Sequence, residues 1–136
     1  MIRNRIPDKW KAKSILEAAQ KEIVFIKTIP ITEESAATVI RSIYECFRML
    51  GDALLAILGK EATGQDHHSE MISALFTLKV ETKRPLQIIG NLKSTRNKIN
   101  YQGYIPTKAE AQEAIDIANS CFTALYEEIK KEVDKK

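Results

Sequence analysis

TEESAATVIRSIYECFRMLGDALLAILG (residues 32–59) is the longest regular pattern in this chain, and it decides the fold class. Apolar side chains recur at alternating spacings of four and three residues, at Ala36, Ile40, Ile43, Phe47, Leu50, Leu54 and Ile57. That spacing places all of them on one face of a helix. Thr32 has the chemistry of an N-cap and Gly59 that of a helix stop, so we predict one long helix between them.

The opposite face of this helix is polar. Arg41, Glu45, Arg48 and Asp52 follow one another at spacings that allow ion pairs within the helix. Such pairs usually mark a solvent-facing surface and each contributes only a few tenths of a kcal/mol. In a bundle, however, a polar face can also line a cleft, and Glu45 is therefore kept as a candidate.

Shorter patterns predict the rest of the architecture. We expect a first helix from Pro7 and Asp8 to about Thr28, and a short third helix from Asp66 or Ser69 to near Val80. The fourth helix should have Pro85 in its first turn and end near Tyr101, before Gly103. The last helix should be capped by Thr107. Residues 60–68 are expected to form a polar loop, residues 130–136 to fray, and no segment indicates a strand. The prediction is an all-α fold, an antiparallel up-and-down helical bundle of four main helices plus a shorter one, in a single domain spanning residues 1–136.

The composition indicates the general class of protein. The chain has 136 residues, 44% of them hydrophobic and 29% charged, as ordinary globular domains do. The longest apolar run, residues 53–58, is too short to span a bilayer, and the start of the chain lacks the apolar stretch of a signal peptide. We therefore expect a cytoplasmic protein with no membrane association, in which Cys46 and Cys121 are reduced thiols.

Metal and cofactor sites are not expected. Neither cysteine has metal-ligand spacing, and His67 and His68, the only histidines, are adjacent in sequence. Adjacent side chains on a helix diverge by about 100°, so the two rings cannot easily share one ion. The simpler interpretation is that both histidines belong to a helix-capping region, although either side chain could lie near a site formed by a distant part of the sequence.

The stretch IGNLKSTRNKINYQGY (residues 89–104) departs from a plain structural pattern. Ile89, Leu92 and Ile99 mark one helix face, but the same stripe passes through Arg96. An arginine facing inward keeps its proton, so it must find acceptors or line a wet cleft. Asn100 lies one turn further along nearly the same face and can join it. A site and a satisfied arginine that braces a helix junction are equally compatible with this pattern.

Positive charge is concentrated around this stretch. Residues 79–108 hold seven basic side chains against one acidic one, a net of +6, whereas the whole chain carries +3. Basic side chains beside tyrosine and asparagine suit a phosphate backbone with unpaired bases. We predict binding of RNA or a nucleotide through Lys93, Arg96, Lys98, Asn100 and Tyr104. A solvated basic face is the alternative.

The order of these elements resembles the HEPN domain family, small helical bundles of prokaryotic toxin–antitoxin and defence systems and of some eukaryotic proteins. The likeness covers nearly the whole chain, from the first helix to the late helix with its Arg-Asn motif. The family motif is an arginine, often followed by a polar residue such as asparagine, then four to six residues, and then a histidine. Arg96 and Asn97 match its beginning, but Tyr101 stands where the closest-spaced histidine would be, and no histidine follows His68.

The resemblance implies a homodimer in which the arginines line a shared cleft. It makes Arg96, Asn97 and Tyr101 the candidate catalytic positions, in a metal-independent cleavage of RNA. Because a phenol is a poor base at neutral pH, the expected function is an RNA- or nucleotide-binding module with weak or absent catalysis. The alternatives are an active ribonuclease toxin and an interaction subunit that partners a small nucleotidyltransferase.

Overall fold

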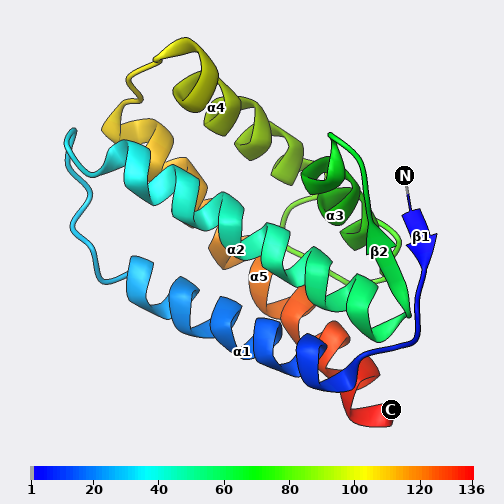
Figure 1. The fold of residues 1–136 in the computed structure, drawn as a ribbon. Helices are drawn as coiled ribbons and strands as arrows, with labels where there is room; N and C mark the ends of the chain where they lie inside the picture. Colours follow the sequence, from blue (N-terminus) through cyan, green and yellow to red (C-terminus); the bar gives the residue numbers. More distant parts are fainter. Residues whose placement is uncertain (1) are drawn as a thin grey trace.

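The computed structural model describes residues 2–136, which form a bundle of helices and one small two-stranded ribbon (Figure 1). The helices are α1 (Lys9–Ile26), α2 (Ala36–Ile57), α3 (His67–Leu75), α4 (Ile88–Gln102) and α5 (Lys108–Lys135), and the strands are β1 (Ile2–Asn4) and β2 (Lys60–Ala62). The predicted all-α fold class is confirmed, and α3 is the shorter helix.

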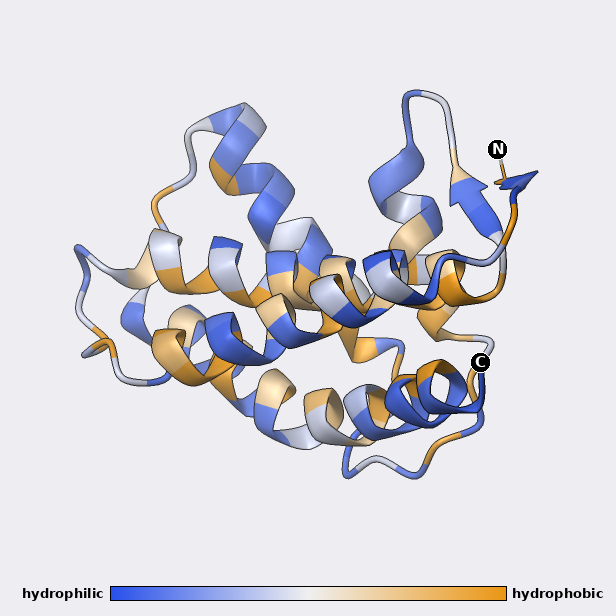
Figure 2. Ribbon diagram, turned by 60° about the horizontal axis from the view of Figure 1, so that its bottom comes forward, coloured by the Kyte–Doolittle hydropathy of each residue, from blue (hydrophilic) through white to orange (hydrophobic). Residues whose placement is uncertain are grey.

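Helix α2 is the centre of the bundle. It packs against α1, α3, α4 and α5, and it runs opposite to α1 and α4 (Figure 1). The hydrophobic faces of the helices turn toward one another, and polar residues colour the outside (Figure 2). Because several helices cover α2, its buried positions extend beyond the predicted stripe to Tyr44, Cys46 and Gly51. An edge-to-face contact between Phe47 and Phe122, with ring centroids 5.8 Å apart, joins α2 to α5.

Local capping chemistry determines several helix ends as predicted. The Asp8 side chain accepts a hydrogen bond from the backbone N–H of Lys11 at the start of α1. Thr107 and Glu110 form a reciprocal capping box that begins α5. Gly103 ends α4 with a φ of 66°, a left-handed conformation that glycine adopts without steric cost.

The predicted start of α2 and the predicted loop after it are both wrong. Thr32 and Ser35 exchange hydrogen bonds in a separate turn, Thr32 N–H to Ser35 Oγ at 2.9 Å and Ser35 N–H to Thr32 Oγ1 at 3.0 Å, and α2 begins only at Ala36. Residues 60–62 pair antiparallel with residues 2–4, with Arg3 opposite Glu61. Three residues are too few to show an alternating pattern, so periodicity could not reveal either strand.

The third helix starts after Asp66 as expected but ends earlier, the fourth begins later, and the fifth continues further than expected. The chain leaves α3 after Leu75 through bonds to the third preceding carbonyl, as in Leu78 N–H to Leu75 O at 3.2 Å. A similar turn, with Ile88 N–H bonded to Pro85 O at 3.0 Å, precedes α4, so this helix begins one turn after Pro85. The C-terminal residues do not fray, because α5 continues to Lys135 and buries Val133.

Two expectations from the sequence concern membrane-spanning helices and the state of the cysteines. Within residues 2–136, none of the helices combines the length and the apolar character that a membrane span requires. Cys46 and Cys121 are both buried free thiols. Burial raises the pKa of the Cys46 thiol to about 12, so this group is an inert part of the core.

Candidate functional site

The guanidinium of Arg96 lies at the junction of α4 and α2. Its Cζ lies 4.8 Å from the centroid of the Tyr44 ring and 5.8 Å from that of Tyr101, and its NH1 donates a 2.9 Å hydrogen bond to Asn97 Oδ1. The side chain is half-buried. No carboxylate of the described residues forms an ion pair with it. Arg96 therefore holds a positioned positive charge with donors to spare.

Tyr44 provides the surface on which Arg96 rests. Its side chain is buried, and within the described part of the chain its hydroxyl has no hydrogen-bond partner. Burial raises the pKa of Tyr44, although the charges of Arg96 and Arg48 act in the opposite direction. The phenol therefore stays protonated at neutral pH, and its O–H is a donor with no acceptor inside the fold.

The polar face of α2 is a part of this junction and is not simply a solvated surface. Arg48 donates from Nε to both carboxylate oxygens of Glu45, at 3.0 and 2.9 Å, and from NH2 to the same group. Its NH1 reaches Met71 Sδ of α3 at 3.1 Å, and the Arg48 side chain is only 16% exposed. The predicted pairing on this face is confirmed for Glu45 and Arg48. The charge of Arg48 is thus compensated by Glu45, whereas that of Arg96 is not.

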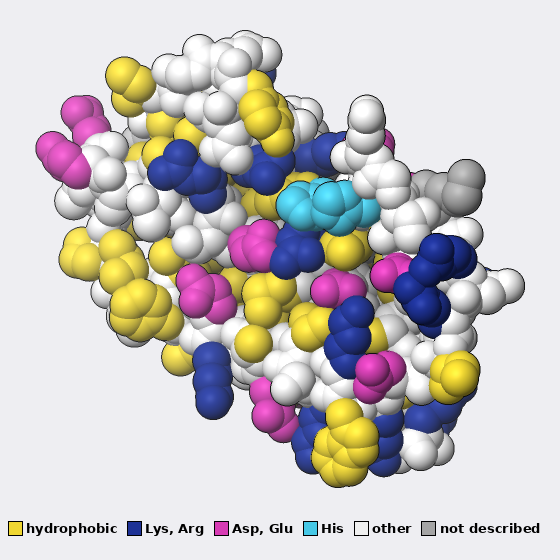
Figure 3. All heavy atoms as spheres, viewed as in Figure 1, with side chains coloured by type: hydrophobic (Ala, Val, Ile, Leu, Met, Phe, Trp, Pro, Cys, Tyr) yellow, Lys and Arg dark blue, Asp and Glu magenta, His cyan; other side chains and the backbone are white. Residues whose placement is uncertain are grey.

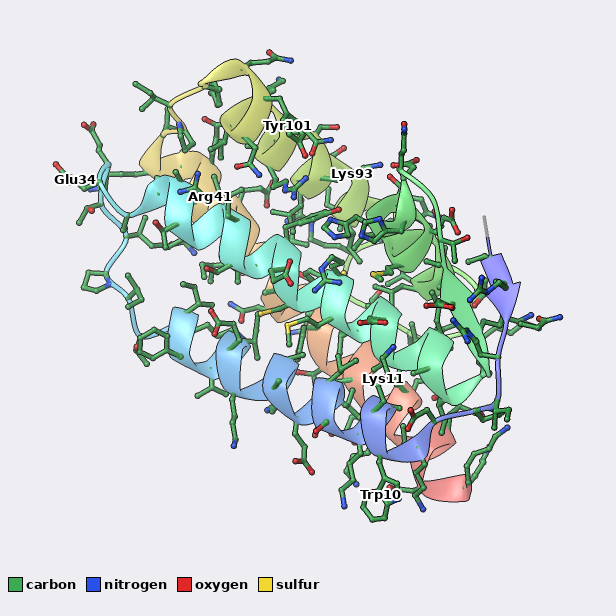
Figure 4. All side chains as sticks on the ribbon, viewed as in Figure 1. Trp10, Lys11, Glu34, Arg41, Lys93 and Tyr101 are labelled. Atoms are coloured by element: carbon green, nitrogen blue, oxygen red, sulfur yellow. The ribbon has the colours of Figure 1, made fainter. Side chains whose placement is uncertain are left out.

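A cleft of ≈290 Å³ opens beside Arg96. Arg96 and Asn100 line it from α4, Tyr44 and Glu45 line it from α2, and Glu22 reaches it from α1. Arg41 also lines the cleft from α2, while Lys93 and Tyr101 project from earlier and later turns of α4 (Figure 4). The structure thus brings Asn100 to Arg96, as the sequence predicted.

Three contacts dock α3 against the same junction. Lys93 of α4 donates to the hydroxyl of Ser69, and Arg48 of α2 contacts Met71. Gly51 allows the close approach, because a Cβ there would lie 2.0 Å from the backbone oxygen of Met71. Only glycine fits this position without a shift of α3. These contacts fix the first turn of α3, where both histidines lie.

The two adjacent histidines are both half-buried and their rings meet edge to face, with centroids 4.4 Å apart, but their other neighbours differ. His67 Nδ1 lies 3.1 Å from the carbonyl oxygen of Gly64, so its ring is engaged with the preceding loop. His68 is half-buried, and burial together with the charges of Arg48, His67 and Arg96 lowers its pKa, which Glu45 partly opposes. Figure 3 shows both rings in cyan at the meeting of α2, α3 and α4, flanked by basic and acidic side chains. His68 is therefore neutral at pH 7 within an arginine-rich cluster.

The remaining predicted binding residues lie elsewhere. Lys98 lies over the Tyr104 ring at 6.0 Å, and the Tyr104 hydroxyl donates to Glu110 Oε1 at 2.6 Å. This pair belongs to the α4–α5 connection, where it braces the start of α5. Positions 96 and 98 are about 200° apart around a helix, so Lys98 projects away from Arg96. Tyr101 is 74% exposed, beside Arg96 but outside the buried junction.

Sequence reasoning did not assign Tyr44 or His68 to the site. Tyr44 adjoins Glu45, which was a candidate, but its burial comes from the helices that cover α2 and leaves no mark in the pattern. The position of His68 depends on the Gly51 contact between distant segments. We use the name Arg96 cluster for Tyr44, Glu45, Arg48, His68 and Arg96.

Two larger hollows lie at the other end of the molecule. One of ≈620 Å³ lies between the ribbon, α2 and α3, with Leu55 and Leu58 among its lining residues. The other, of ≈560 Å³, includes Arg5 and Glu61, which form an ion pair at 2.6 Å. Within the described residues, no group of three or more histidine, cysteine or acidic side chains could hold a metal ion. Size alone does not make either hollow a better candidate than the smaller, polar cleft at Arg96.

Comparisons with family models, curated proteins and solved structures gave no match to this chain. The site is therefore interpreted from its own chemistry.

Proposed function

We propose that this protein is a HEPN-like module that binds RNA or a nucleotide through the Arg96 cluster, with weak or absent catalysis. The observation that carries the proposal is the half-buried guanidinium of Arg96, held over Tyr44 and free of carboxylate partners. Arginine presents several N–H donors in one plane, which suits the oxygens of a phosphate.

The proposal includes a two-fold homodimer of the kind found in toxin–antitoxin and defence systems. A cleft that is open on one side, as the cleft at Arg96 is, gains a second wall when two copies pair. Light scattering at micromolar concentration is expected to give the mass of a dimer. A monomer at that concentration would remove the shared cleft from the proposal and leave binding by single chains.

Binding is tested with single-stranded RNA at several salt concentrations. Because phosphate contacts release counterions, affinity is expected to fall with salt with a slope of about −0.7 for each phosphate contacted. Arg96→Ala should weaken binding and flatten this slope. The matched control is Lys108→Ala, at the exposed start of α5, which should have little effect. Equal losses from both variants would mean a diffuse basic surface and would reject the site.

A further inference from the structure

Two large apolar side chains project into solvent where the chain enters α1. Ile6 is 88% exposed, and Trp10, the only tryptophan of the chain, is 76% exposed. Trp10 lies opposite the buried face of α1 and points away from the bundle at the lower edge of Figure 4. Single exposed apolar side chains are ordinary on protein surfaces, so these two point to a binding surface only together with their surroundings.

The backbone that carries Ile6 is fixed on both sides. Arg5 N–H donates to the carbonyl oxygen of Gly59 at 2.6 Å, and Asp8 N–H donates to that of Ala56 at 3.0 Å. The approach at Gly59 is close, because a Cβ there would lie 2.6 Å from the Arg5 carbonyl oxygen. The fold therefore presents Ile6 on an ordered backbone. A surface that is ordered before binding loses less conformational entropy when it binds.

Basic side chains surround these two residues. Residues 3–13 contain five basic side chains and one acidic one, a net of +4, whereas the whole chain carries +3. Residues 60–61 of the facing strand, a lysine and a glutamate, cancel each other. Lys9, Lys11 and Lys13 are exposed, and none of them forms an ion pair within residues 2–136. Figure 3, in the same view as Figure 4, shows basic side chains around the apolar group at the lower edge of the molecule.

We propose that Ile6, Lys9, Trp10 and Lys13, which we call the N-terminal patch, bind the surface of an anionic lipid bilayer. Isoleucine and tryptophan side chains enter the boundary between the headgroups and the acyl chains, and lysines interact with the anionic headgroups. The N-terminal patch lies outside the Arg96 cluster, so this contact is independent of RNA binding there.

The contacts of the patch favour a lipid surface over an extended nucleic acid or peptide. Lys13 Nζ lies over the Trp10 ring, 5.9 Å from its centroid, so a stacking face that an unpaired base would use is already in a cation–π contact. Ile6 has no ring on which a base could stack, but it can enter an apolar layer. An extended strand also needs a groove to follow, and Trp10 lines none of the hollows described above.

A contact of this kind needs no membrane-spanning segment. The expectation of no membrane association came from the lack of a long apolar run, and no helix within residues 2–136 is a candidate span. That criterion does not address a surface contact, which requires only a few apolar side chains together with basic ones.

The test is sedimentation of the full chain with vesicles made of equal parts phosphatidylcholine and phosphatidylserine, beside vesicles of phosphatidylcholine alone. The native chain should sediment with the anionic vesicles and not with the neutral ones, and added salt should release it. Because Trp10 is the only tryptophan, its fluorescence reports on the patch directly. Its emission should shift to shorter wavelength on binding, as the ring leaves water.

Two pairs of variants locate the contact. Trp10→Ala should lower partitioning into anionic vesicles by about tenfold, because burial of one large apolar side chain is worth about that factor. Its matched control is Ile105→Ala, which removes an 80% exposed side chain from the opposite end of the molecule (Figure 1). Lys13→Glu should lower partitioning by at least about fivefold. Lys27→Glu makes the same charge change about 20 Å further along α1 and should have little effect.

Each measurement can contradict the proposal. Failure of the native chain to bind anionic vesicles would overturn it, as would equal losses in a variant and its matched control. Vesicle binding with an unshifted Trp10 emission would place the contact on another surface and would also overturn it. Single-stranded RNA, titrated in parallel, should leave Trp10 emission unchanged. If RNA quenches that emission and anionic vesicles do not bind, the patch is a nucleic-acid surface and the lipid assignment is wrong.

Discussion

Helices α4 and α5 both lie along α2, yet they meet it with different chemistry. Helix α5 buries a long series of apolar side chains: Ala111, Ala114, Ile117, Ala118, Cys121, Phe122, Leu125, Ile129 and Val133. Helix α4 buries only Ile89, Leu92 and Ile99, and places Arg96 against Tyr44 on the same side. The apolar contact between α5 and α2 stabilises the fold, whereas the polar contact between α4 and α2 leaves the charge of Arg96 without a carboxylate partner. The core and the candidate site therefore lie on different sides of α2.

The largest expected effect comes from truncating leucines on the two sides of this comparison. Leu125→Ala in α5 and Leu92→Ala in α4 remove the same atoms, and such changes cost about 2–5 kcal/mol of unfolding free energy. Leu125→Ala should lower the free energy of unfolding more than Leu92→Ala. A cavity of ≈80 Å³ already borders Leu92, so the side chains around Leu92 can move in to fill the space that the substitution leaves. Urea unfolding measures both. A greater loss for Leu92→Ala would show that α4 is as much a part of the core as α5.

A pair of glycines gives the next effect. In Gly51→Ala the new Cβ meets the Met71 backbone at 2.0 Å, so α3 must shift, and overpacking of this kind costs about 1–3 kcal/mol. Gly90→Ala in α4 meets nothing within 4 Å and should stabilise the helix, by up to about 1 kcal/mol. Thermal unfolding should therefore shift in opposite directions. If Gly51→Ala is neutral, α3 is not fixed by this contact.

The smallest effect is the pH dependence contributed by His68. Its pKa is lowered in the folded chain, so between that value and the ordinary one the unfolded state binds a proton that the folded state does not. The contribution of His68 to the free energy of unfolding should therefore be fully present above the ordinary pKa of histidine, and it should be lost as the pH falls through the lower pKa of the folded state. His68→Gln should remove this component in melts between about pH 7 and pH 5.

His67→Gln serves as the control for that measurement. If both variants change the pH dependence alike, the two histidines do not differ as their contacts indicate.

The sequence predicted those parts of the fold that depend on local rules. The periodicity of α2 and α5, the caps at Asp8 and Thr107 and the stop at Gly103 all follow from residue types within a few positions of one another. The ribbon could not be foreseen in this way, because β1 and β2 are short and lie far apart in the chain. The same limit applied to the Gly51–Met71 approach, which decides where α3 lies.

Only those residues of the candidate site that carry a local signal could be predicted from the sequence. Arg96 interrupts an apolar stripe, which is a local signal, and Asn100 follows at helical spacing. Lys98 was grouped with Arg96 by charge alone, and the helix turns it toward Tyr104. His68 carried no local signal, because its surroundings are made by two other helices. The functional roles of these residues stay predictions.

The antiparallel ribbon has a consequence for the order in which the chain assembles during synthesis. Ile2 pairs with Ala62, so the unit of β1, α1, α2 and β2 can close as soon as residue 62 has left the ribosome. Domains generally acquire structure from the N-terminal side as they emerge. Until α5 has been made, this early hairpin exposes the apolar face of α2 that α5 later covers. Nascent chains stalled after residue 62 should therefore be the species that chaperones bind most strongly.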